Sequence, residues 1–121
     1  MKDGEIDLKD RTKRFALRVI RMFTRLPKAE VARILGRQVL RSGTSVGANY
    51  READEGRSKA EFISKMGDSL RELSETEYWL ELLVESETAT PKSMAPLLQE
   101  TRELKLIFAT IIRKARGGGE K

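Results

Sequence analysis

The sequence predicts an all-α protein, an antiparallel up-down-up-down bundle of four helices. Glycine is absent from residues 5–35 and 68–116, and proline occurs only at positions 27, 91 and 96. Long stretches without these two residue types favour uninterrupted helices. Apolar residues also recur at steps of three and four in four separate segments, which is the spacing of amphipathic helices.

The first two helices are separated by Pro27. The first is predicted from Lys9 to Arg25, because its apolar residues share one face. These residues are Phe15, Val19, Met22, Phe23 and Leu26. Pro27 can serve as the first residue of the second helix, where proline is favoured. The apolar face of the second helix is predicted to contain Val31, Ile34, Leu35 and Val39.

The third and fourth helices begin at recognisable capping residues. Ser58 and Glu61 have the spacing of a capping box, which satisfies backbone amides at a helix start. The apolar stripe that follows contains Phe62, Met66, Leu70, Leu73, Leu80 and Val84. Thr90 before Pro91, or Ser93, can open the fourth helix. Its predicted buried face is Met94, Leu97, Leu98, Thr101, Leu104, Phe108, Ile111 and Ala115, and glycines 117–119 end it.

The domain organisation is expected to be simple. A chain of 121 residues has the size of one domain, and we expect the bundle at residues 9–116 between flexible ends at 1–8 and 117–121. No run of about 18 apolar residues is present, and the start of the chain is too polar for a secretory signal. A cytoplasmic protein without a membrane partner is therefore expected.

Small and polar residues interrupt the apolar pattern of the second helix at positions 42–48. The run from Gly43 to Gly47 lowers helix propensity by roughly 2–3 kcal/mol relative to alanine. Three interpretations follow. The small residues can bring a neighbouring helix close while their hydroxyls bond the backbone one turn earlier, the chain can form a loop or kink, or the segment can bind a ligand or partner.

A polar seam is predicted beside the apolar face of the second helix. Its members are Gln38, Arg41, Ser42, Ser45, Asn49 and Glu52, joined by Glu77 of the third helix. Glu77 lies between Leu73 and Leu80 on the apolar stripe, where an unpaired carboxylate is costly to bury. We expect Arg41 to be its partner, although a small rotation of the third helix would place Glu77 at the boundary instead.

Charge is segregated along the chain. Residues 9–41 contain eleven Lys or Arg residues against Asp10 and Glu30, a local charge of +9. Residues 68–87 contain seven acidic residues against Arg71, a local charge of −6. The net charge of +5 therefore understates the fields that a partner would meet.

Arginines form continuous rows on the first two helices. The candidate nucleic-acid-binding residues are Arg11, Arg14, Arg18, Arg21, Arg25, Arg33 and Arg37. The planar guanidinium suits phosphate or carboxylate, so the rows can bind nucleic acid, can meet the acidic third helix of a neighbouring subunit, or can simply be solvated. The nearby aromatics Phe15 and Phe23 are expected on the core side, so sequence-specific reading of bases is not supported.

Catalysis is not predicted. The chain has no cysteine and no histidine, which removes thiolate and imidazole chemistry and the usual zinc and di-iron sites. The glycines at 43 and 47 lack the spacing and the lysine of a phosphate loop. We expect no enzyme activity, no metal and no cofactor. Tyr78 and Trp79 are adjacent and point about 100° apart, so we expect them at an oligomer interface.

Two segments resemble a known family. RSGTSVGANYREA at residues 41–53 and RSKAEFISKMGDSLRELSETEYWLELL at 57–83 are similar to the four-helix bundle proteins encoded in intervening sequences of bacterial 23S ribosomal RNA genes. That family also resembles the accessory variability proteins of diversity-generating retroelements. The resemblance spans residues 12–115. It implies a left-handed antiparallel bundle, a cyclic homopentamer and no established enzymatic activity. In the retroelement relatives a basic barrel is associated with nucleic acid and a reverse transcriptase.

These observations together indicate a non-catalytic, self-assembling helical bundle. It is expected to form a ring and to bind RNA, DNA or a nucleic-acid-handling protein through its arginine-rich face. The alternative is a purely structural interaction module whose arginines are used in subunit contacts. Salt dependence of nucleic-acid binding distinguishes the two, because each neutralised phosphate releases counterions.

Overall fold

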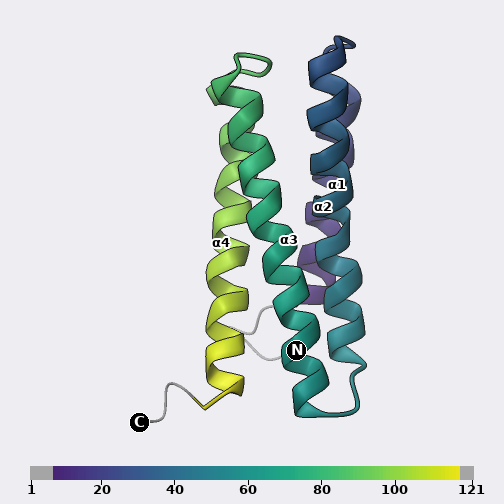
Figure 1. Ribbon diagram of the computed structural model, residues 1–121, viewed down its shortest axis with the longest axis vertical. Coiled ribbons are helices and arrows are strands. Elements are labelled where there is room, and N and C mark those ends of the chain that lie inside the picture. The colour runs from purple at the N-terminus through teal and green to yellow at the C-terminus, as the bar shows by residue number, and fades with distance from the viewer. Residues whose placement is uncertain (1–6, 118–121) are drawn as a thin grey trace.

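The computed structural model describes residues 7–117 and contains four helices (Figure 1). They are α1 (Leu8–Arg25), α2 (Glu30–Asp54), α3 (Lys59–Glu85) and α4 (Pro91–Ala115). Within residues 7–117 no strand is present, so the predicted all-α class is confirmed.

The ends of the bundle fall close to the predicted positions. Helix α1 begins at Leu8, one residue earlier than expected, because the Asp7 carboxylate caps it by accepting a hydrogen bond from the Asp10 amide at 3.1 Å. Helix α4 ends at Ala115, and Gly117 follows with a φ of 78°, a conformation that glycine adopts without strain. The flexible ends predicted from the sequence otherwise concern residues 1–6 and 118–121, which lie outside the described residues.

Each helix runs antiparallel to the next. Contacts across every interface join rising residue numbers on one helix to falling numbers on its neighbour. The pairs are Thr12 with Gly47 and Phe23 with Gly36 between α1 and α2, Ser42 with Thr76 and Glu52 with Lys65 between α2 and α3, and Glu77 with Lys105 and Glu81 with Arg102 between α3 and α4. The loops between these helices are short, as the up-down-up-down arrangement requires.

Two predicted helix starts are confirmed and one is wrong. Ser58 Oγ accepts a hydrogen bond from the Glu61 amide at 3.0 Å, and Thr90 Oγ1 accepts one from the Ser93 amide at 3.1 Å. Pro27 does not open α2, which begins three residues later at Glu30. Pro27 instead ends α1, because a residue before proline is driven into extended backbone and Leu26 has a ψ of 151°.

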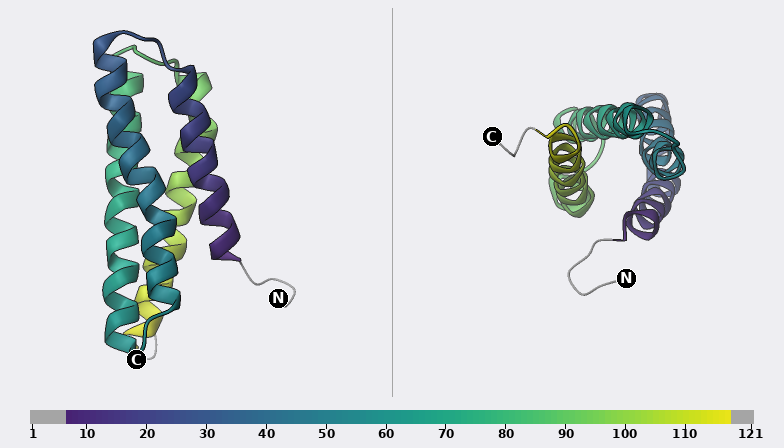
Figure 2. Two further views of the ribbon diagram at one scale, coloured as in Figure 1. Left: turned by 90° about the vertical axis from the view of Figure 1, so that its right-hand side faces the viewer. Right: turned by 90° about the horizontal axis from the view of Figure 1, so that it is seen from below.

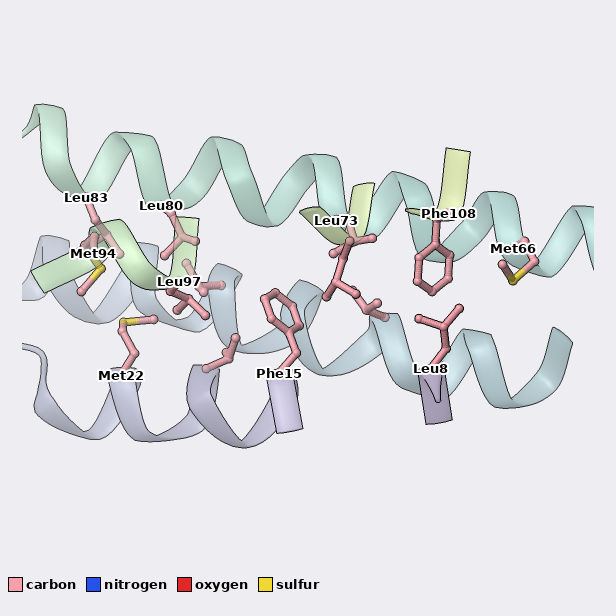
Figure 3. Close-up of a cluster of buried hydrophobic side chains, with 14 of the residues drawn as sticks. Leu8, Phe15, Met22, Met66, Leu73, Leu80, Leu83, Met94, Leu97 and Phe108 are labelled. Carbon is pink, nitrogen blue, oxygen red and sulfur yellow. The ribbon is translucent and has the colours of Figure 1, made fainter. Parts of the chain in front are cut away.

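The core contains one continuous cluster of apolar side chains along the bundle (Figure 3). The predicted stripes of α1, α3 and α4 supply most of it. The prediction for α2 is wrong in part, because Val31 and Ile34 are 54% and 51% exposed. Ala32 and Gly36 are buried in their place beside Val39. These small residues let α1 approach α2 closely. A prediction based on hydrophobicity alone overlooks them, because their side chains are barely apolar.

Helix α2 is continuous through residues 42–48. Thr44 and Ser45 donate their hydroxyls to the carbonyls of Leu40 and Arg41, each at 2.7 Å. Gly43 packs against Val19 of α1, where a Cβ would come within 2.8 Å of the valine Cγ2. This confirms that the small residues bring a neighbouring helix close and bond the backbone one turn earlier.

The bundle is open on one side. Helices α2 and α3 share the most extensive interface, and α1 and α4 touch each other least. The end-on view in Figure 2 shows α1 and α4 on either side of this open flank. Each helix therefore packs mainly against its neighbours in the sequence: α1 packs against α2, and α4 packs against α3.

Candidate functional site

A groove runs along the open flank between α1 and α4. It consists of two adjoining hollows of about 620 and 540 Å³, which share Arg18 and Arg21 in their walls. The larger hollow lies where the C-terminal part of α1 faces the N-terminal part of α4, and the smaller one continues toward Arg11 and Glu100. Five of the seven arginines predicted as binding residues line this groove.

The larger hollow has an apolar floor between two different walls. Its floor contains Met22, Met94 and Leu97, which Figure 3 shows together at one end of the core. One wall is formed by the α1 arginines. The other is formed by the hydroxyl-bearing residues Thr88, Thr90 and Ser93 at the start of α4. An anionic group with an apolar portion would find complementary surfaces on both sides.

Arg11 closes the far end of the groove. Its Nε and Nη2 donate to the two carboxylate oxygens of Glu100 at 2.8 Å each, and Nη2 also bonds Glu103 at 2.9 Å. The hydrogen bond to Glu100 is the main reason why the pKa of Arg11 is raised. Hydrogen bonds from Gln99 and then Arg11 lower the pKa of Glu103. Arg11 is therefore occupied within the subunit.

The next arginines along α1 make fewer ion pairs than Arg11 within the described residues. Arg14 makes an exposed ion pair of 2.9 Å with Asp10 of the same helix. Within residues 7–117, Arg18, Arg21 and Arg25 make no ion pair. Three arginines without a carboxylate partner in the described part of the chain thus line the larger hollow.

Arg33 and Arg37 lie on a different surface. The guanidinium of Arg33 stacks over the ring of Phe23, 5.3 Å from its centroid. Phe23 and Arg25 are two residues apart on α1 and project about 160° from each other, so Arg33 lies on the opposite flank of α1 from the groove. Arg37 is exposed one turn further along α2. The arginines predicted as one face therefore occupy two.

The predicted polar seam forms part of the interface between α2 and α3. Ser42 and Thr76 share a buried hydrogen bond of 2.7 Å between their hydroxyls. Arg41 contacts Glu72 at 3.2 Å and Glu75 at 2.6 Å, and the Glu75 hydrogen bond is the main cause of its raised pKa. The remaining contacts join Glu52 to Lys65 at 2.8 Å and Gln38 to Arg41 at 3.4 Å, while Ser45 bonds its own helix and Asn49 is half-buried.

The partner predicted for Glu77 is wrong. Its carboxylate accepts hydrogen bonds from Lys105 Nζ at 2.7 Å and from Arg102 Nε at 2.6 Å, both on α4. Burial by itself would raise the pKa of Glu77, but these two cations outweigh it and hold the pKa below its usual range. Glu77 lies on the flank of α3 that faces α4, whereas Arg41 approaches the opposite flank.

Most of the acidic charge of α3 is neutralised inside the subunit. Glu72 and Glu75 pair with Arg41, Glu77 and Glu81 pair with Arg102, and Asp68 pairs with Arg71 of its own helix. The sequence did not predict the role of Arg102 and Lys105, although their spacing of three places both on one face of α4. Their role depends on which helix this face packs against, and the sequence of α4 alone does not specify its neighbour.

Tyr78 and Trp79 differ in how accessible they are. Tyr78 is 54% exposed, while Trp79 is half-buried against the core. Their rings meet edge to face with centroids 5.1 Å apart. The indole Nε1 of Trp79 is buried and has no hydrogen-bond partner among residues 7–117. Of the two residues predicted at an oligomer interface, Tyr78 is the one that presents its ring to solvent.

Two further classes of site find no support in the part of the chain that the structure describes. Its His, Cys, Asp and Glu residues nowhere form a group of three or more placed to hold a metal ion. Its four helices are also too polar or too short in their apolar stretches to cross a membrane. The groove between α1 and α4 remains the principal candidate site.

Comparison with known proteins gives a clear relationship. The 23S rRNA-intervening sequence protein family matches residues 4–109. The chain is also similar to a protein of unknown function from the S23 ribosomal protein family of Bacteroides thetaiotaomicron VPI-5482, known from a crystal structure at 1.70 Å. The two are 38% identical with a TM-score of 0.82, over 88% of this chain and 95% of that one. No curated protein matches the sequence. The chain belongs to the 23S rRNA-intervening sequence protein family.

Proposed function

We propose that the protein is a non-catalytic, self-assembling bundle that binds nucleic acid through the arginine row of α1. The observation that carries the proposal is the group of Arg18, Arg21 and Arg25, which line one groove and have no ion-pair partner within residues 7–117. Guanidinium groups bind phosphate in a planar, two-point geometry, and a row of them tracks a charged backbone.

The electrostatics of α1 support this proposal. Residues 11–28 carry seven Lys or Arg residues and no carboxylate. A run of one sign raises the local concentration of polyanions and speeds their association. Binding of this kind is insensitive to base sequence, because phosphate contacts position a protein on nucleic acid without reading the bases.

The structure weakens the alternative in which the arginines pair with the acidic α3 of a neighbouring subunit. Glu72, Glu75, Glu77 and Glu81 already have cationic partners in their own subunit. A head-to-tail contact through them would have to break those pairs. The groove arginines are therefore better suited to a partner that brings its own negative charge.

Salt titration tests the proposal. Binding to fluorescently labelled RNA and DNA of arbitrary sequence, measured by anisotropy, should weaken steeply as salt rises. The triple variant Arg18→Gln/Arg21→Gln/Arg25→Gln should reduce the slope of log affinity against log salt by about 2–3, roughly one for each lost phosphate contact. The matched control Lys13→Gln/Arg33→Gln/Arg37→Gln removes the same charge elsewhere and should change the slope by less than about 1. Absence of binding at low salt, or equal effects of the two variants, would contradict the proposal.

Self-assembly is the second part of the proposal, and exposed Tyr78 supports it. Family resemblance implies a ring of five, so light scattering should give a mass five times the 13.8 kDa of one chain. Tyr78→Ser should lower that mass. Leu106→Ser is a matched control, since Leu106 is also exposed but lies on α4. A monomeric mass for the unmodified chain, or an unchanged mass for Tyr78→Ser, would overturn this part.

A further inference from the structure

The groove between α1 and α4 presents a single row of positive charge. From Arg11 to Arg25 the row extends over 14 residue-to-residue steps of α1, about 21 Å at 1.5 Å per step. Across the groove, residues 88–97 at the start of α4 contain Lys92 as their one charged residue, and Lys92 does not line the hollow. A duplex carries two phosphate backbones, whereas one row of guanidinium groups can follow only one.

The floor beside this row suits the faces of bases. Met22, Met94 and Leu97 offer apolar atoms at the bottom of a hollow of about 620 Å³. Methionine is flexible and polarisable, and it adapts its contacts to flat rings. Bases paired inside a duplex cannot reach such a floor, because their faces are stacked on one another. Unpaired bases can leave the stack and enter it.

The opposite wall adds neutral hydrogen-bonding groups. Thr88, Thr90 and Ser93 line it. They lie at the N-terminus of α4, the 25-residue helix whose dipole places partial positive charge at this end. Hydroxyls can bond the sugar and the base edges of a strand without demanding a particular base. Among residues 7–117, no carboxylate lines either wall of the larger hollow.

The groove also has a defined end. At this end Arg11 is held by Glu100, which also lines the smaller hollow, so the guanidinium of Arg11 is not available to a phosphate. The groove arginines that have no ion-pair partner within residues 7–117 are Arg18, Arg21 and Arg25. They provide for about three phosphates, one for each guanidinium group.

We infer that this groove is a binding site for single-stranded nucleic acid. The phosphates lie on Arg18, Arg21 and Arg25, and the bases enter the hollow above Met22, Met94 and Leu97. This inference rests on the proposed function and specifies which form of nucleic acid the same arginines select.

A groove-filling variant separates this inference from simple attraction of charge. Ser93→Phe adds a large side chain in the hollow without changing the charge, and it keeps the backbone amide that Thr90 caps. Ala95→Phe is the matched control, since Ala95 is exposed on α4 and projects about 160° away. Anisotropy with a labelled 12-nucleotide strand and the corresponding 12-base-pair duplex, at one salt concentration, measures the effect. Thermal unfolding verifies that both variants fold.

The single strand should bind the unmodified protein more tightly than the duplex does. Ser93→Phe should weaken single-strand binding roughly tenfold, as loss of one base contact does, and should leave duplex binding unchanged. Ala95→Phe should change neither by more than about twofold. Equal binding of strand and duplex, or an unaffected Ser93→Phe, would overturn the inference while salt-dependent binding still upholds the proposed function. Loss of all salt-dependent binding in the unmodified protein would overturn both.

Methionine methyl groups give a second readout that needs no substitution. In a sample labelled with carbon-13 at the methionine methyls, addition of the 12-nucleotide strand should shift the resonances of Met22 and Met94. Met66 is fully buried and does not line the groove, so its resonance should stay in place. Unmoved Met22 and Met94 resonances at saturating strand would contradict occupation of the hollow.

Discussion

Two glycines in long helices occupy opposite environments. Gly43 of α2 faces Val19, and a Cβ at this position would lie 2.8 and 3.1 Å from the two valine methyl carbons. At Gly67 of α3, no contact from residues 7–117 lies within 4 Å of the place where a Cβ would be. Val19 is fully buried and β-branched, so it has little freedom to move aside. The two sites therefore separate the packing role of glycine from its effect on helix propensity.

Alanine at these positions should change stability in opposite directions. Gly67→Ala should raise the free energy of unfolding by about 0.5–1 kcal/mol, because alanine restricts the unfolded chain and adds no clash. Gly43→Ala should lower it by about 1 kcal/mol, because overpacking of 1–3 kcal/mol exceeds the gain in helix propensity. Urea unfolding of both variants measures the difference. Stabilisation by Gly43→Ala would show that α1 and α2 are not in close contact there.

The carboxylate of Glu77 should make stability depend on pH. Its folded-state pKa lies below the ordinary value of 4.5, so its stabilising effect is fully present above that value and is lost as the pH falls through the folded-state pKa. Glu77→Gln should lower the free energy of unfolding at neutral pH by about 1–2 kcal/mol, since two charge-assisted hydrogen bonds at a side chain 17% exposed are weakened. Urea unfolding across the acid range should show this difference shrinking below about pH 4.5.

Glu81→Gln is the matched control for Glu77. Glu81 has one longer contact, 3.2 Å to Arg102, and a side chain that is 39% exposed. Exposed pairs contribute little, so its effect should stay below that of Glu77→Gln at neutral pH. A difference between Glu77→Gln and the unmodified chain that is constant down to strongly acidic pH would contradict the role assigned to the carboxylate.

For the helices, the sequence predicts features within one helix well, and it predicts contacts between helices poorly. The caps at Ser58 and Thr90 are set by residues three positions away, so their spacing is visible in the sequence. The spacing of Glu77 from Leu73 and Leu80 likewise predicted a partly buried carboxylate that needs a partner. Its partner depends on the rotation of α3 between α2 and α4, which a periodicity does not specify. Val31 was misplaced because Ala32 and Gly36 are the buried residues of this part of α2, and small residues carry little weight in a hydrophobic pattern.

The hydroxyl pair between α2 and α3 should contribute cooperatively to their register. Thr76 Oγ1 also bonds the carbonyl of Glu72 at 2.8 Å, whereas the other contact of Ser42 Oγ, to Val39, is a long 3.5 Å. Thr76→Val should lower the free energy of unfolding by about 1–3 kcal/mol, because it leaves the buried hydroxyl of Ser42 poorly bonded. Ser42→Ala should lower it by only about 1 kcal/mol, because Thr76 keeps its bond to Glu72. The double variant should lose less than the sum of the two by about 1 kcal/mol.

Ser45→Ala provides the control for this cycle. Ser45 donates to the carbonyl of Arg41 in its own helix and does not bond α3. Its removal should cost less than about 0.5 kcal/mol and should add to the effect of Thr76→Val. Chemical denaturation of the single and double variants measures the coupling. Strict additivity of Ser42→Ala and Thr76→Val would show that their hydrogen bond does not stabilise the pairing of α2 with α3.

In the complete bundle, α2 and α3 form a central pair, and α1 and α4 pack on its outer sides. Helices α2 and α3 are buried against each other most extensively, while α1 and α4 each depend mainly on one neighbour. The groove arises from this arrangement, because the first and last helices do not close the ring of contacts. The arginine row on α1 could be predicted from the sequence. The groove beside it could not, since its width depends on the separation of α1 and α4.

Arg11 is the main polar link across the open flank, with hydrogen bonds of 2.8 Å to Glu100 and 2.9 Å to Glu103. Its side chain is 23% exposed, so solvent screens these contacts only in part. Openings that detach α1 or α4 should therefore require less free energy than openings that separate α2 from α3.

Native-state hydrogen exchange followed by mass spectrometry should reveal this hierarchy. Amides of α1 and α4 should exchange faster than those of α2 and α3, since fewer packed residues must be released. Arg11→Gln should speed exchange in α1 and α4 about fivefold, corresponding to about 1 kcal/mol, and should leave α2 and α3 unchanged. Arg14→Gln is the control, because within the described residues Arg14 pairs only with Asp10 of its own helix. A uniform acceleration in all four helices, or an equal effect of Arg14→Gln, would show that the bundle opens as a single unit and that the ion pairs of Arg11 do not hold its open side.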